Sequence, residues 1–93
     1  MSTGALIGIL KGTGAIVVGA ERTSADYRIE VFRGRTVASG LLAMKPGIVR
    51  AAFDQGAVQF ELEDGTRIAI RATAWHAGGF VDFETSRADL PGY

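Results

Sequence analysis

The sequence has no cysteine and no asparagine, and it has only two prolines and two lysines. Without cysteine the chain can form neither a disulfide nor a metal site with thiolate ligands. Without asparagine it has no N-glycosylation site. It also lacks an excess of charge of one sign, since ten basic and ten acidic residues cancel. This balance gives no support for binding polyanions through bulk charge.

Side chains that could carry catalysis are few as well. His76 is the only histidine, and none of the four serines stands in a Gly-x-Ser-x-Gly motif. Glu61, Glu63 and Asp64 lack the regular carboxylate spacing of a calcium loop. We therefore expect a protein that is not an enzyme and that has no cofactor and no metal site.

The 93 residues fit one domain with a thin core, because 14 of the apolar residues are alanine. We expect a single β-rich domain over residues 1–86, followed by an irregular, mobile tail over residues 87–93. No basic residue precedes the first apolar stretch, which argues against a secretory signal and favours a cytoplasmic protein. A partner subunit would help such a small domain to bury its surface.

Residues 4–20 form the most apolar segment, and Lys11 is its only charged residue. A stretch of this length with a charge near its middle is a poor membrane span, so we expect no contact with a membrane. Its five glycines disfavour a helix. We predict two short strands, over residues 5–10 and 15–19, whose weakly charged edges are prone to pair with another chain.

Residues 58–72 alternate between apolar and polar side chains about an Asp-Gly turn. A three-residue loop keeps one face of this hairpin apolar. It sets Phe60 opposite Ile68 on the apolar face and Glu61 opposite Arg67 on the polar face. We predict this register.

A weaker copy of the same pattern predicts a second hairpin with its turn at Arg33-Gly34. Ile29 would then lie opposite Val37. A two-residue turn at Gly34-Arg35 is the alternative, and it would shift the register.

The dipeptide Gly78-Gly79 predicts a third hairpin with a two-residue turn. In that register Trp75 lies opposite Asp82, on the polar face of the strand pair. The strand that contains Trp75 then pairs with both of its neighbours along the chain.

Together these elements predict an all-β fold: a small antiparallel, partly open barrel or a sandwich of six to seven short strands with one short helix. The helix is expected at residues 47–55, between Pro46 and Gly56. The alternation also predicts a core, which consists of Ile29, Val31, Val37, Leu41, Phe53, Val58, Phe60, Leu62, Ile68, Ile70 and Phe83.

The candidate interaction face is centred on Trp75, the only tryptophan. In the predicted register it points outward with Arg71 and Asp82, and Phe80 enlarges the patch. Tryptophan beside arginine is typical of protein interfaces, although the same ring can stack on a base or a sugar. The remaining alternative is that other parts of the same subunit cover Trp75.

The sequence thus favours a non-catalytic protein-interaction or structural module that self-associates. A homodimer is the favoured assembly, and another protein is a further candidate partner. The alternative interpretation is a nucleic-acid-binding small β-barrel that uses an Arg/Trp face. Nucleic acid is the less favoured partner, because glutamates between the arginines cancel much of the positive field.

Overall fold

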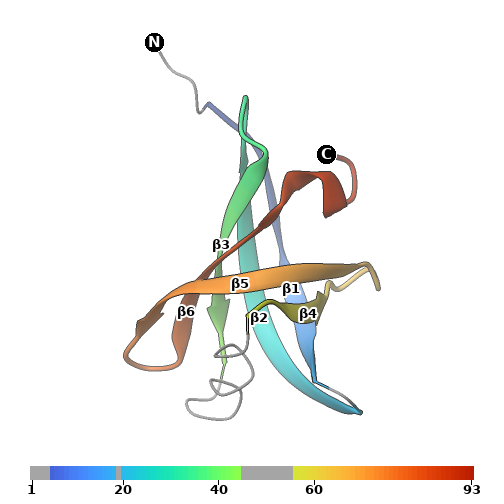
Figure 1. Ribbon diagram of the computed structural model, residues 1–93, viewed down its shortest axis with the longest axis vertical. Helices are drawn as coiled ribbons and strands as arrows, with labels where there is room; N and C mark the ends of the chain where they lie inside the picture. Colours follow the sequence, from blue (N-terminus) through green and yellow to red (C-terminus); the bar gives the residue numbers. More distant parts are fainter. Residues whose placement is uncertain (1–4, 19, 45–55) are drawn as a thin grey trace.

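The structure is a computed structural model that describes residues 5–18, 20–44 and 56–93, in which six antiparallel strands close into a barrel (Figure 1). The strands are β1 (Leu6–Val18), β2 (Glu21–Phe32), β3 (Val37–Ala43), β4 (Val58–Glu61), β5 (Arg67–His76) and β6 (Phe80–Ser86). Their order around the barrel is β1-β2-β3-β6-β5-β4, and β4 pairs back onto β1. The predicted all-β fold is confirmed, as a closed barrel and not a sandwich.

β1 is one continuous strand, so the prediction of two short strands is wrong. It pairs with β2 along its whole length, and one bulge interrupts the ladder between Leu6 and Gly8. Inward-facing glycines on β1 allow side chains of other strands to pack closely against its backbone where the barrel closes. A Cβ on Gly14 would lie 2.8 Å from Cζ of Phe60, which is too close for any larger residue without rearrangement.

The β4–β5 hairpin has the predicted register, with Phe60 opposite Ile68 and Glu61 opposite Arg67. Its three-residue loop is closed by a backbone hydrogen bond of 2.8 Å, which the amide of Leu62 donates to the carbonyl oxygen of Thr66. Gly65 in this loop has a φ of 93°, a left-handed conformation that glycine adopts without strain.

The β2–β3 register differs from the one given by a turn at Arg33-Gly34, because Ile29 lies opposite Gly40 and not opposite Val37. It is the register that the alternative turn at Gly34-Arg35 gives. The turn spans residues 33–36, one residue more than a three-residue loop. This shift reverses the faces of β3. Val37 and Leu41, both predicted for the core, therefore point outward and are exposed.

The β5–β6 register also differs, because the loop contains Ala77 as well as Gly78 and Gly79. His76 is then opposite Phe80, and Trp75 is opposite Val81 instead of Asp82. A shift of one residue moves every side chain near the turn to the other face of the sheet. Trp75 consequently lies on the inner face, where it packs against the core.

Most of the predicted core is buried. The predicted residues that the structure buries are Ile29, Val31, Val58, Phe60, Leu62, Ile68, Ile70 and Phe83. Ile16, Leu42 and Val81 join them from positions that the prediction left out. Phe53 and the helix expected at residues 47–55 lie outside the described residues.

The chain after β6 is more ordered than the irregular tail expected for residues 87–93. A 3₁₀ helix, η1, spans Arg87–Asp89, and the amide of Arg87 donates a hydrogen bond of 2.9 Å to the carbonyl oxygen of Thr36. Leu90 is only 4% exposed and belongs to the core cluster. The C-terminal segment therefore completes the barrel interior.

Candidate interaction surface

Three of the four residues predicted for the interaction face point outward from β5 and β6. Arg71 is exposed and lies opposite Glu84, Asp82 lies between two buried neighbours, and Phe80 is 43% exposed. The structure therefore brings Arg71, Asp82 and Phe80 to the outer face of the same strand pair.

Trp75 is separated from these residues. A bulge between Ala72 and Ala74 changes the register of β5 against β6, and such a bulge turns the side chains that follow it. Trp75 is half-buried and packs against the core cluster. Its own subunit thus covers much of the indole, which was one of the three alternatives considered from the sequence.

The one histidine of the chain is the last residue of β5, next to the β5–β6 turn. His76 Nε2 lies 2.9 Å from Asp82 Oδ2, and both side chains are about half exposed. Phe80 is directly opposite His76. This pair has the geometry of a surface contact in water, and such contacts contribute little to stability.

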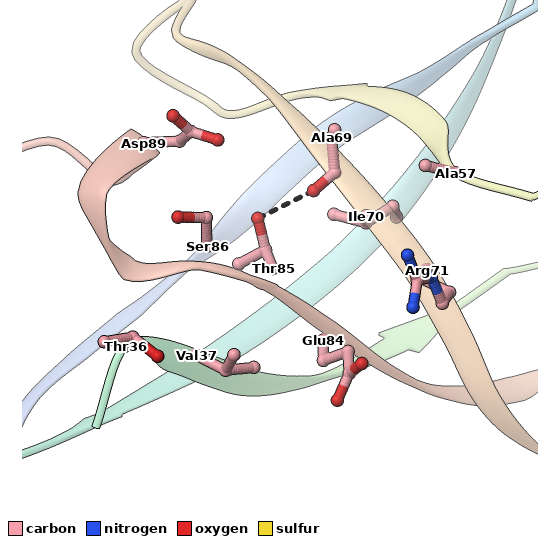
Figure 2. A pocket seen from close by; sticks show the side chains of 10 residues that line it. All are labelled: Thr36, Val37, Ala57, Ala69, Ile70, Arg71, Glu84, Thr85, Ser86 and Asp89. Atoms are coloured by element: carbon pink, nitrogen blue, oxygen red, sulfur yellow. Dashed lines mark hydrogen bonds between the residues drawn. The ribbon is translucent and has the colours of Figure 1, made fainter.

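A hollow of about 390 Å³ opens where β6 leaves β5 and continues into η1 (Figure 2). Arg71 and Glu84 lie at one side of it and Asp89 at the other. Thr85 Oγ1 donates a hydrogen bond of 2.7 Å to the carbonyl oxygen of Ala69, which ties the two diverging strands together. The lining combines apolar side chains with charged groups of both signs.

Two exposed apolar residues on β3 extend this outer face, and sequence reasoning assigned both of them to the core. Leu41 lies between Arg28 of β2 and Asp82 of β6, and these three residues line a smaller hollow of about 290 Å³. Val37 lies at the start of the same strand, opposite Ser86. No local signal separates the faces of β3, because both of its alternating sets contain apolar residues.

The free edge of β1 is a second surface feature. Among residues 5–18, 20–44 and 56–93, β1 pairs with β4 only through residues 15–17, and residues 8–14 have a neighbouring strand, β2, on one side only. Near the C-terminal end of this stretch, the amide of Thr13 donates a hydrogen bond of 3.0 Å to Glu63 Oε1. The amide of Glu63 in turn donates to Tyr27 Oη at 3.2 Å.

An ion network joins three strands near the point where the barrel closes. Glu61 on β4 contacts both Arg22 on β2 and Arg67 on β5, the latter at 3.3 Å. The hydrogen bond from Arg22, together with Arg67, holds the pKa of Glu61 below its ordinary value. The predicted pairing of Glu61 with Arg67 is confirmed, and it forms part of a structural network.

A second carboxylate is held charged by its own turn. The amide of Thr66 donates a hydrogen bond of 2.9 Å to Asp64 Oδ1, and this bond lowers the pKa of Asp64. The interaction is local, because the two residues belong to the same loop. It fixes the turn that carries the adjacent Glu63 toward β1.

Over the described ranges, 5–18, 20–44 and 56–93, no group of three histidine, cysteine or acidic residues is arranged to hold a metal ion. In the same residues no helix has the length and apolar character needed to cross a membrane. Comparisons of the chain with protein families, curated proteins and solved structures give no match.

Proposed function

We propose that this protein is a non-catalytic, cytoplasmic protein-interaction module that acts by associating with further copies of itself. The observation that carries the proposal is the set of large apolar side chains turned outward on β1, β3 and β6. A composition without cysteine is compatible with the reducing environment of the cytoplasm.

Within the described residues, six of the seven exposed large apolar side chains belong to these three strands. They are Leu6, Ile9 and Val18 on β1, Val37 and Leu41 on β3, and Phe80 on β6. Single exposed apolar residues are ordinary, but each one that a partner removes from water stabilises an association. In a chain of 93 residues such exposure favours a partner that covers it.

Nucleic acid remains the alternative partner, and the charge arrangement argues against it. Arg71 lies opposite Glu84, and Arg67 contacts Glu61. Since these arginines have acidic neighbours, they do not form the continuous basic track that follows a phosphate backbone. The packing of Trp75 against the core also weakens the stacking platform on which this alternative depended.

Sedimentation velocity over a micromolar concentration series tests the proposal. We expect a species of at least two chains whose fraction grows with concentration. A mass of one 9.8 kDa chain at every concentration would contradict self-association. As an internal comparison, Leu41→Ser should shift the equilibrium toward the monomer, while Thr36→Ser, at an exposed polar site, should not.

The nucleic-acid alternative has its own measurement. Titration of the protein with a fluorescent single-stranded oligonucleotide in low salt should give no saturable signal. Saturable binding that weakens steeply with added salt would contradict the protein-interaction proposal and favour nucleic-acid binding. Phosphate contacts release counterions, which makes the affinity depend on salt.

A further inference from the structure

We propose that the free edge of β1 pairs antiparallel with the same edge of a second copy, across a twofold axis at Leu10. This inference rests on the proposed self-association, and it names the surface and geometry of one contact. Twofold pairing is the commonest closed arrangement of soluble homo-oligomers. Such pairing requires the backbone N–H groups of the edge in one copy to lie opposite the C=O groups of the same edge in the other copy.

The accessible part of this edge projects from the barrel. In Figure 1 the upper half of β1 rises beside β2 beyond the level at which β5 crosses the molecule. β4 pairs only with the lower half, through residues 15–17. The C-terminal segment lies beside this part of β1. Tyr93 Oη occupies the direction that a Cβ on Gly8 would take, and Pro91 lines a hollow of about 290 Å³ together with Leu10, Lys11 and Glu63.

The hydrogen bond at Thr13 shows which backbone groups face outward along this edge. The amide of Thr13 points away from β2, since it donates to Glu63 in the β4–β5 loop. Backbone groups alternate in direction along a strand. The N–H and C=O groups of Ile9 and Lys11 therefore point to the same free edge.

Both ends of this available edge are defined. At the C-terminal end, the Glu63 side chain already accepts the hydrogen bond of the Thr13 amide. At the N-terminal end, the bulge between Leu6 and Gly8 interrupts the regular strand. Ile9 and Lys11 between them offer two donors and two acceptors. Among the described residues, no strand pairs with this edge at Ile9 or Lys11.

One register uses all four of these groups. With Leu10 on the twofold axis, Ile9 of one copy lies opposite Lys11 of the other, and the reverse pair is equivalent. Each pair exchanges two backbone hydrogen bonds, so the contact contains four. A shift by one register step would place Lys11 against its own copy or against the bulged Ile7, and like charges directly opposite are destabilising.

The outer face carries no like-charge conflict with a second copy in this register. Ile9 lies opposite Glu30 on β2, and Lys11 lies opposite Arg28. Two basic residues thus sit side by side within one chain, with Arg28 only 3.5 Å from Glu30 on the same strand. In the proposed register Ile9 of one copy lies beside Lys11 of the other, and Glu30 and Arg28 flank this pair on the two β2 strands. The apolar Ile9 thus keeps the two Lys11 side chains apart across the axis.

A cysteine cross-link tests this geometry directly, because the chain has no cysteine of its own. Residues on the axis form a pair without mutual hydrogen bonds, with Cα atoms about 4.5 Å apart, and a disulfide spans this separation. Under mild oxidation Leu10→Cys should give a two-chain species that reductant splits. Val18→Cys, exposed at the far end of β1, should remain a single chain.

A backbone variant supplies an independent test. Lys11→Pro removes the N–H that points to the free edge and leaves the bonds to β2 intact. It should abolish the dimer in sedimentation with an unchanged circular dichroism spectrum, whereas Lys11→Ala should retain at least half of it. A wild-type chain that is always monomeric would overturn both proposals. A wild-type oligomer that Leu10→Cys does not cross-link would overturn only this inference.

Discussion

Gly40 on β3 lies directly opposite Phe83 on β6, and the phenyl ring covers the glycine. A Cβ on Gly40 would overlap the ring. Phe83 is 1% exposed, so its ring fills the space that the missing side chain leaves. This contact requires Gly40 to face inward, and it therefore turns Leu41 to the outside.

Gly40→Ala should destabilise the barrel by about 2 kcal/mol, because the added methyl must displace a packed ring. Ser39→Ala is the matched control, since Ser39 is the exposed neighbour on the same strand and should change the free energy by less than about 0.5 kcal/mol. Urea unfolding followed by tryptophan fluorescence measures both. Equal effects of the two variants would contradict the inward placement of Gly40.

Trp75→Ala should lower the free energy of unfolding by about 2 kcal/mol or more, because the indole packs against the core. Phe80→Ala removes an aromatic ring from the opposite side of the sheet, where Phe80 is 43% exposed, and should cost less than about 1 kcal/mol. Chemical unfolding in dilute samples, monitored by circular dichroism, compares them. If Phe80→Ala lowered the free energy of unfolding more than Trp75→Ala, the inward position of Trp75 would be wrong.

Leu90→Ala should destabilise the protein by about 2 to 3 kcal/mol, since it removes a buried side chain that is only 4% exposed. Asp89→Ala, at the exposed neighbour in η1, serves as the control and should be close to neutral. Thermal unfolding distinguishes them. If both variants melt like the wild type, residues 87–93 do not complete the core.

Glu61→Gln should reduce stability near neutral pH, and the difference from the wild type should shrink as the solution is acidified. The pKa of Glu61 is lowered in the folded protein by Arg22 and Arg67. Its contribution is thus complete above the ordinary glutamate pKa of 4.5 and is lost as the pH falls through the lowered value. Because the network is exposed to solvent, the effect should be modest and should weaken in salt.

Melting temperatures of both proteins between pH 7 and pH 3 measure this dependence. Gln59→Ala provides the control, because Gln59 is exposed on the same strand and does not titrate. A difference between Glu61→Gln and the wild type that stays constant over this range would show that Glu61 does not act through its charge.

The sequence by itself determined the β4–β5 hairpin, including its loop and register. Phe60 and Ile68 fall on an apolar face while Glu61 and Arg67 fall on a polar one. Such a strict alternation leaves one register that buries the apolar set. The all-β class and most of the core follow from the same local pattern.

Only the tertiary structure decided the faces of β3, the position of Trp75 and the free edge of β1. β3 is apolar on both alternating faces, so its orientation depends on Phe83, a partner distant in sequence. The bulge in β5 turns Trp75 inward. Within the part of the chain that the structure describes, residues 8–14 of β1 lack a second neighbouring strand, because the barrel closes through a short β4. Each outcome depends on contacts between distant strands, which short-range periodicity does not encode.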